Sequence, residues 1–153
     1  MSIENKLKEL KINLPTPPNP VGSYVAFKII NNILYISGQI SIDENGKFTK
    51  GKIGKDLTIK EGQEAAKLCA INIIAQAKKA CGGDLNKISN CIKLTGYVNS
   101  TDNFTDQPKI INGASDLISD VFEEKGKHVR AAISSNSLPL GVAVEVDAIF
   151  ELK

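Results

Sequence analysis

Two stretches with helical periodicity constrain the fold of this chain most, because each carries apolar residues along one side only. The first begins at Thr58, where Glu61 completes a capping box three residues later, and it ends at Gly82. The second begins at Asp106, as a cap, and ends at Gly126. Segments with strand-like alternation precede, separate and follow these stretches. One-sided helices must pack on another surface, and a sheet built from those segments can supply it.

The end of the chain predicts two strands. Residues 128–134 and 142–150 each alternate between apolar and more polar side chains, as expected for a strand with one buried face. The connection over residues 136–141 is short enough for an antiparallel pair. Such a pair places Glu145 opposite Arg130, or diagonally near it, on the same polar face. A guanidinium and a carboxylate would then line one surface of the sheet.

The earlier part of the chain adds a short helix, a hairpin and another strand. Apolar residues at helical spacing after Ser2 predict a short amphipathic helix, and the proline-rich segment 15–20 excludes both helix and central strand. Residues 25–37 predict a hairpin whose turn is a pair of asparagines, because asparagine tolerates the positive φ angles of a tight turn. Residues 89–98 predict a strand between the two long helices.

The order of strands, helix, strand, helix and strands predicts an α+β fold. We expect a two-layer mixed sheet of about six strands with two main helices on one face, plus the short N-terminal helix. At 153 residues the chain suits one domain, which we place at residues 1–153, with residues 1–19 as an N-terminal helix and proline-rich extension. No third layer covers the far face of the sheet, so we expect oligomerisation to cover it.

The charge pattern argues against a nucleic-acid partner. The chain has 19 lysine and arginine residues against 17 aspartates and glutamates, a net charge of +2, and the two signs are interspersed. Aromatic residues make up 5% of the chain and tryptophan is absent, so few rings could stack on bases. We therefore expect no nucleic-acid partner.

The sequence carries no metal or membrane signature. Cys69, Cys81 and Cys91 are far apart, form no Cys-x-x-Cys pair, and have a single histidine to join them in binding a metal. We expect buried free thiols and no metal site. Residues 1–14 are too charged for a signal peptide, and no apolar run approaches membrane length. We expect no membrane partner and a cytoplasmic protein.

Arg130 is the only arginine in a chain that otherwise uses lysine for its positive charge. A guanidinium can hold a carboxylate with two parallel hydrogen bonds, which fixes both its position and its orientation, and lysine cannot. One hypothesis is therefore a carboxylate clamp. The alternative is that Arg130 pairs with Glu145 or Asp147 across two strands, a surface contact worth up to about 1 kcal/mol.

Several short motifs occur in an order that resembles the RidA/YjgF family of reactive-intermediate deaminases, also called L-PSP endoribonucleases. The motifs are specific together and weak singly, and they span most of the chain. They are Pro20-Val21-Gly22-Ser23-Tyr24, Ser37-Gly38-Gln39, Asn112 within the second long helix, Arg130, Leu138-Pro139 eight residues later, and the run from Val142 to Ala148.

The resemblance implies a chorismate-mutase-like fold that forms a homotrimer with ligand sites between subunits. It implies that Arg130 is catalytic and clamps a substrate carboxylate, and that Glu145, also catalytic, orients or activates water. It places Tyr24, Ser37 and Asn112 around the substrate. Each has a structural alternative: a cross-strand partner of Arg130 for Glu145, a buried aromatic for Tyr24, turn chemistry for Ser37, and a helix-surface amide for Asn112.

By this resemblance the chain is a hydrolase similar to 2-iminobutanoate/2-iminopropanoate deaminase. It would convert a reactive enamine or imine, such as 2-aminoacrylate, to a 2-keto acid and ammonia, without a cofactor. Its partners would be the carboxylate-bearing imine or enamine, or the 2-keto acid. The alternative is a non-catalytic trimer that binds a small carboxylate or acts as a regulatory or chaperone-like protein. Endoribonuclease activity is less favoured, because the chain has no basic stripe and one histidine.

The chain also departs from the pattern of the family. Many members have a cysteine two residues after the arginine, where this chain has Ala132. Thiol chemistry is therefore absent at that point, and a mechanism based on a carboxylate clamp and water is unaffected. The N-terminal helix, an insertion after Phe104 and the greater length indicate a longer branch of about 150 residues, at the upper end of the common domain size.

Overall fold

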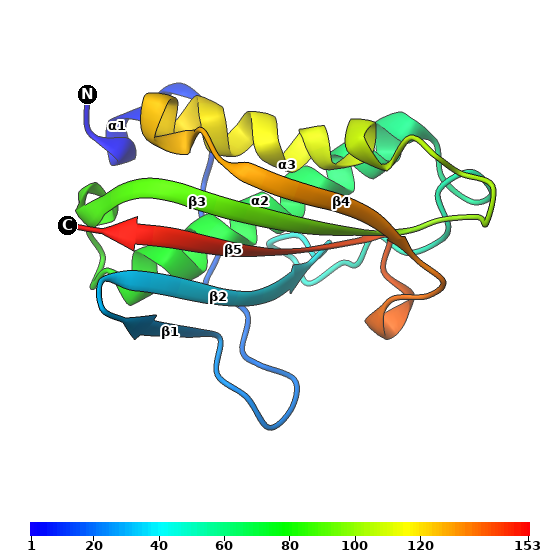
Figure 1. Ribbon diagram of the computed structural model, residues 1–153, viewed down its shortest axis with the longest axis horizontal. Helices are drawn as coiled ribbons and strands as arrows, with labels where there is room; N and C mark the ends of the chain where they lie inside the picture. Colours follow the sequence, from blue (N-terminus) through cyan, green and yellow to red (C-terminus); the bar gives the residue numbers. More distant parts are fainter.

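The computed structural model describes all residues 1–153, which form one five-stranded sheet with three helices. The strand order is β1-β2-β5-β3-β4, antiparallel except for the parallel pair of β3 and β4 at one edge (Figure 1). The elements are α1 (Ile3–Glu9), β1 (Phe27–Ile30), β2 (Ile33–Ile40), α2 (Ile59–Ala80), β3 (Ile88–Asn99), α3 (Gln107–Phe122), β4 (Val129–Ser135) and β5 (Val144–Leu152). The two-layer α+β prediction is confirmed, with five strands in place of about six.

The missing strand belongs to the segment after β2. This segment makes only isolated bridges, which join Ile42 to Phe48, Lys50 to Val142, and Ile53 to both Leu57 and Ser100. A strand needs a continuous ladder of backbone hydrogen bonds, and this segment turns away after each bridge. It forms instead a loop that leads to the capping box of Thr58 and Glu61 at the start of α2, as predicted.

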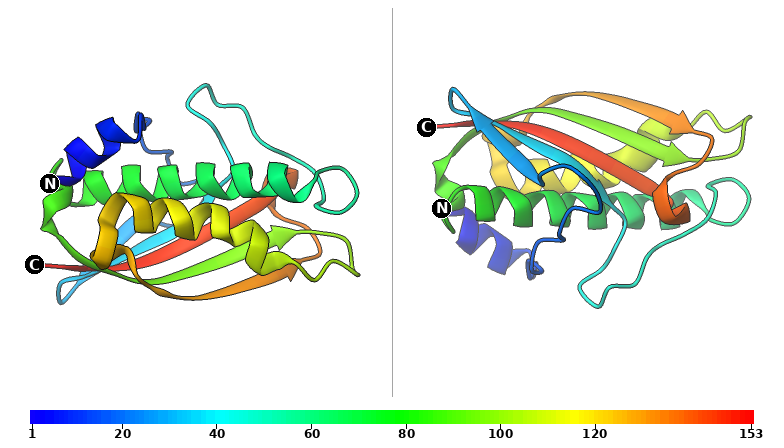
Figure 2. Two further views of the ribbon diagram at one scale, coloured as in Figure 1. Left: turned by 90° about the horizontal axis from the view of Figure 1, so that it is seen from above. Right: turned by 90° about the horizontal axis from the view of Figure 1, so that it is seen from below.

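Helices α2 and α3 lie side by side on one face of the sheet, as both views in Figure 2 show. The apolar stripe predicted for α3 is buried, from Ile110 to Phe122. The face of α2 is built largely from alanines, and small side chains let a helix approach a sheet closely. The two helices also approach each other closely at Gly113, where a Cβ atom would lie 2.1 Å from the carbonyl oxygen of Gln63.

The two predicted features at the start of the chain are confirmed. Ser2 caps α1, and its hydroxyl accepts a hydrogen bond from the backbone of Asn5. The hairpin of β1 and β2 turns at Asn31 and Asn32, whose φ angles are 49° and 63°. Two successive positive φ angles match the twist of the flanking strands, so the register of this hairpin is set locally.

Strands β4 and β5 do not pair with each other, contrary to the sequence prediction. Leu94 of β3 lies between them, opposite Arg130 on one side and Ala148 on the other. The cause is α3, which returns the chain beside β3, so β4 runs parallel to β3 at the edge of the sheet. The short connection then crosses the end of β3 to reach β5 on its other side.

The face of the sheet opposite α2 and α3, here called the open face, carries exposed apolar side chains. Tyr35 is 45% exposed, Val129 is 66% exposed and Ile133 is 49% exposed. Their strand neighbours Leu34, Arg130 and Ala132 point to the helical side. The single chain therefore leaves apolar side chains in contact with water on this face, at the strands on either side of its polar centre.

The three cysteines are free and buried, as predicted. Burial raises the pKa of the Cys91 thiol to about 12 and raises the pKa values of Cys69 and Cys81 as well. These thiols stay protonated at neutral pH and are poor nucleophiles. Separately, none of the helices is both long enough and apolar enough to cross a membrane.

Candidate functional site

A cavity of about 660 Å³ lies between the proline-rich segment, the end of β2 and the turn that precedes β5. It brings together Tyr24 and Glu145, two residues that the sequence predicts for the site. Six apolar side chains account for much of its wall: Val21, Tyr24, Ile40, Ile42, Phe48 and Leu140. A concave apolar pocket with a few polar groups is the usual form of a small-molecule site.

Glu145 points from β5 toward β2 at the wall of this cavity. A Cβ atom at Gly38 would lie 2.7 Å from Glu145 Oε1, so the carboxyl group lies directly against the backbone of β2, and a side chain at this position would displace it. Burial, and secondly the charge of Asp147, raise the pKa of Glu145 above its ordinary value. A carboxyl whose pKa is raised holds a proton more readily than an ordinary glutamate, which suits it to exchange protons with a bound water molecule.

Asp147 and Tyr97 extend this acidic region along the open face. The Tyr97 hydroxyl donates a hydrogen bond to Asp147 Oδ2 at 3.3 Å. Burial raises the pKa values of both groups. The sequence did not select Tyr97, although strand alternation places Asp147 on the same face as Glu145, two residues away. The carboxyl of Glu145 therefore has a second carboxyl as its neighbour.

The substitution Asp147→Asn should lower the pKa of Glu145, because it removes the neighbouring negative charge and leaves burial as the remaining cause. A ¹³C titration of the Glu145 carboxyl would measure the shift. Glu151→Gln, farther along β5, is the control and should leave the titration unchanged.

The same variant has a predicted effect on stability. The folded-state pKa values of Glu145 and Asp147 are raised, so their contribution is full below the pKa of the unfolded chain and is lost as the pH rises through the folded-state values. Asp147→Asn should therefore melt above wild type near pH 7, and the difference should shrink in acid. If the titration showed instead that the pKa of Glu145 rises in Asp147→Asn, the charge of Asp147 would not be a cause of the raised pKa in the wild-type protein.

Ser37 and Tyr24 lie close together at one side of the cavity. Ser37 Oγ donates a hydrogen bond to the carbonyl of Val25 at 2.7 Å, and its amide donates to the carbonyl of Ala26 at 2.9 Å. Ser37 therefore fixes the segment that carries Tyr24, and its side chain is not among those that line the cavity. Tyr24 is 52% exposed, which excludes the alternative of a buried aromatic.

Arg130 lies away from this cavity, on the helical side of β4. Nη1 donates a hydrogen bond to Ser115 Oγ at 3.0 Å and Nη2 donates to the carbonyl of Pro108 at 3.1 Å. The predicted pairing of Arg130 with Glu145 or Asp147 is wrong, because Arg130 makes no salt bridge and faces the other side of the sheet. At about 4.8 Å between strands and about 3.3 Å per residue, the Cα atoms of Arg130 and Glu145 lie roughly 14 Å apart.

Two hydrogen bonds of His128 set the orientation of the Ser115 hydroxyl, which accepts a hydrogen bond from Arg130. His128 Nδ1 lies 2.7 Å from the carbonyl of Gly126, and a carbonyl can only accept, so Nδ1 carries the proton. His128 Nε2 then accepts from Ser115 Oγ at 2.9 Å. The lone pairs of Ser115 are left for Arg130, and the Arg130 guanidinium is held in one orientation. Sequence reasoning missed Ser115, for which there was no motif.

Asn112 lies on the same side of α3 as the groups that hold Arg130. It is exposed, and it follows Pro108 by four residues and precedes Ser115 by three, the spacings of neighbours along one helix face. Within one subunit the predicted residues therefore form two groups. Tyr24 and Glu145 line the cavity, and Ser37 holds the segment that carries Tyr24. Arg130 and Asn112 lie at the edge of the sheet beside α3.

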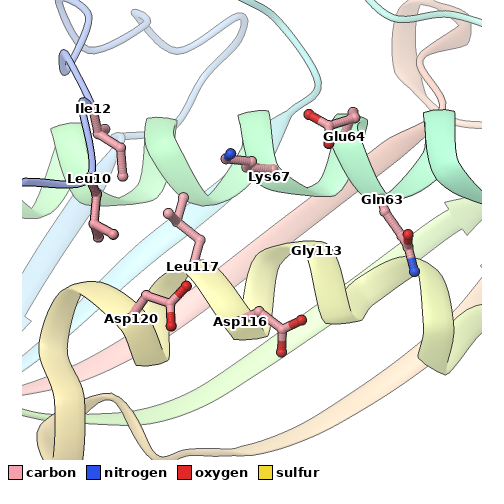
Figure 3. A pocket seen from close by; sticks show the side chains of 9 residues that line it. All are labelled: Leu10, Ile12, Gln63, Glu64, Lys67, Gly113, Asp116, Leu117 and Asp120. Carbon is pink, nitrogen blue, oxygen red and sulfur yellow. The ribbon is translucent and has the colours of Figure 1, made fainter.

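A second hollow, of about 290 Å³, lies between α2 and α3 on the outer surface of the helical layer (Figure 3). Leu10 and Ile12 lie at one end of it, and Glu64, Lys67 and Asp116 line its sides. It contains none of the predicted site residues. The structure has no group of three or more histidine, cysteine or acidic residues arranged to hold a metal ion.

Comparisons with known proteins agree on one family. The sequence profile described as "YjgF/chorismate mutase-like, putative endoribonuclease" matches residues 4–152. Protein TCP17 of Trypanosoma cruzi is 43% identical over 147 residues, which are 95% of this chain and 91% of that protein.

Two crystal structures resemble the chain over nearly its whole length. Atu1372 of Agrobacterium tumefaciens, described as of unknown function, has a TM-score of 0.91 and 46% identity, covering 99% of this chain and 94% of that one. A "putative endoribonuclease" from Shewanella oneidensis MR-1 has a TM-score of 0.95 and 33% identity, covering 99% of this chain and 100% of that one. Together with the profile, these matches confirm the predicted chorismate-mutase-like fold.

Proposed function

Because this chain belongs to the YjgF/chorismate mutase-like family, we propose that it hydrolyses reactive enamines or imines to 2-keto acids and ammonia. The single observation that carries the proposal is the state of Arg130. It is the only arginine, its guanidinium is held by two neutral oxygens, and no carboxylate of the chain neutralises it. A partly buried cation without an acidic partner is a ready site for the carboxylate of a ligand.

We assign the carboxylate to Arg130 and the reacting carbon to the region of Glu145. These residues are too far apart in one subunit to hold one small molecule, and they face opposite sides of the sheet. We propose that assembly of several chains brings Arg130 of one subunit close to Glu145 of another. A homotrimer that covers the exposed apolar side chains of the open face can place the edge of one subunit, with Arg130 and Asn112, beside the cavity of the next. The exposed Tyr35 and Val129 support such an interface.

The proposed reaction needs little from the protein. Glu145 accepts a proton from a water molecule, the water oxygen bonds to the imine carbon, and the electron pair of the C=N double bond moves to nitrogen. The nitrogen then takes the proton from Glu145. The second proton of the added oxygen is transferred to the nitrogen as the C–N bond breaks, so ammonia leaves and the carbonyl of the 2-keto acid forms. Holding the carboxylate and placing the water supply most of the acceleration.

The test is an assay in which an amino-acid oxidase generates the imine in situ and its disappearance is followed with and without this protein. We expect the wild-type protein to accelerate the release of ammonia and 2-keto acid, and we expect light scattering on the same sample to give the mass of a trimer. Glu145→Gln should lose at least about 100-fold in rate, because the amide cannot accept the proton.

Three results would contradict the proposal. A protein that binds a 2-keto acid but leaves the imine lifetime unchanged would be a carboxylate-binding module. A protein that cleaves RNA, in a parallel sample under the same conditions, would be an endoribonuclease. A monomer at micromolar concentration would remove the shared site on which the assignment of Arg130 depends.

A further inference from the structure

We propose that the substrate of this chain carries a bulky apolar side chain, branched or aromatic, which occupies the cavity between Tyr24 and Leu140. The inference rests on the proposed function for the reaction, and on the cavity alone for the class of ligand. In this arrangement the imine nitrogen faces Glu145, and the carboxylate is directed toward Arg130 of the partner subunit.

The cavity is much larger than a three-carbon imine. Its volume is about 660 Å³, and at about 30 Å³ per water molecule it has room for roughly twenty waters. Pockets of about 300–1,000 Å³ hold ligands of drug size. A ligand as small as 2-aminoacrylate would occupy only the end beside Glu145, and most of the apolar wall would remain in contact with water.

The wall of the cavity is charged at one end only. Ile40, Ile42 and Phe48 are partly buried and form one side, while Tyr24 and Leu140 are more exposed and stand at the rim. No lysine, arginine or histidine lines the cavity, and Glu145 is its only carboxyl. A ligand would meet a proton-accepting group at one end and mainly hydrocarbon elsewhere. Such a surface selects a molecule with a basic nitrogen next to a large apolar group.

The cavity is also fixed in shape before a ligand arrives. Its wall includes three prolines, whose rings restrict the backbone. The side chain of Gln76, which is 1% exposed, donates a hydrogen bond to the carbonyl of Pro18 at 2.8 Å and ties the wall to α2. The opposite end of the same segment is held by Ser37. A preformed apolar wall adds affinity because little has to be ordered on binding.

The experiment compares two stable 2-keto acids that differ only in the apolar group. Phenylpyruvate and pyruvate are titrated into the wild-type protein by calorimetry. We expect phenylpyruvate to bind at least about 30-fold more tightly, since burial of an aromatic side chain has about this effect on affinity. Equal affinities, or tighter binding of pyruvate, would overturn the inference.

Two variants test whether the preference for phenylpyruvate arises in the cavity. Ala26 lines the cavity, and its carbonyl is held by the Ser37 amide, so the side chain of Ala26→Leu must enter the cavity space. This variant should lose most of the preference for phenylpyruvate and keep its affinity for pyruvate. Lys79→Leu introduces the same side chain on the exposed side of α2 and should behave as wild type. An unchanged preference in Ala26→Leu would also overturn the inference.

Turnover separates this inference from the proposed function. Tight binding of phenylpyruvate without hydrolysis of the corresponding imine would refute the deaminase and leave the ligand class standing. Hydrolysis of 2-aminoacrylate, with bulky imines neither bound nor hydrolysed, would support the deaminase and refute the ligand class.

Discussion

Replacing Arg130 with lysine should lower kcat/KM for imine hydrolysis by about 100-fold, although the positive charge is kept. In the wild-type protein the guanidinium holds Ser115 Oγ and the Pro108 carbonyl with two different nitrogens. A lysine ammonium group cannot hold both oxygens and also grip a carboxylate at two points. A factor of 100 corresponds to about 2.7 kcal/mol of transition-state stabilisation. Steady-state kinetics on one imine would measure the loss, and Arg130→Ala should lose at least as much.

The same variant should remain folded and keep the oligomeric state of the wild-type protein. The two acceptors of Arg130 are neutral and partly exposed, so their loss should change the melting temperature by less than about 4 °C. Lys127→Ala is the matched control: it removes a nearby cation whose ion-pair partner is the exposed Glu124. A fully active Arg130→Lys protein would contradict the clamp, since only the fork geometry distinguishes the two residues.

Features set by local sequence could be predicted here. The capping box at Thr58 and Glu61, the asparagine turn at Asn31 and Asn32, and the buried stripe of α3 each follow from neighbours within a few residues. Backbone preferences and side-chain spacing act at that range, so they can be seen without the rest of the molecule.

The position of Arg130 depends on more distant parts of the chain. Alternation shows that the two faces of a strand differ, but it does not show which face meets the helices. In β5 the apolar face packs under α2, whereas in β4 the apolar residues Val129 and Ile133 turn to the open face. The polar faces of these two strands therefore point in opposite directions, and Arg130 and Glu145 are separated. The cause is the edge position of β4, whose open side is the proposed subunit interface.

The residues that hold Arg130 could not be found from sequence patterns. Ser115 and Pro108 are joined to it through a helix that crosses the sheet, and His128 acts on Ser115 through a single hydrogen bond. None of these contacts leaves a spacing motif in the chain. The cavity around Glu145 could not be predicted from sequence patterns either, because its wall comes from segments on both sides of α2 in the sequence.

The largest expected loss of stability comes from Gly113→Ala. A Cβ atom there would lie 2.1 Å from the carbonyl oxygen of Gln63 and 2.8 Å from its carbonyl carbon. These are backbone atoms of α2, so the clash is relieved only by moving one helix away from the other. Overpacking of this kind costs about 3 kcal/mol, which for a domain of this size lowers the melting temperature by about 10 °C.

Gly62→Ala is the matched control for this prediction, because it adds the same methyl group on the facing helix. Its Cβ atom would meet Ile110 Cδ1 at 2.7 Å and Ile53 Cδ1 at 2.9 Å, and both are ends of flexible side chains. Rotation of these side chains can relieve the contact, and alanine favours a helix over glycine by about 1 kcal/mol. We expect Gly62→Ala to stay within about 1 kcal/mol of wild type in its free energy of unfolding.

The two glycine variants also connect stability to the proposed site. Helix α3 carries Ser115 and Pro108, so a shift of α3 away from α2 in Gly113→Ala would move both acceptors of Arg130. This variant should therefore lose affinity for the ligand carboxylate even below its melting temperature, whereas Gly62→Ala should keep it. Thermal melts and calorimetric titration with a 2-keto acid would measure both effects. Equal melting temperatures for the two variants would mean that the helices can separate at Gly113 without loss, and the close approach would not be what holds α3 in place.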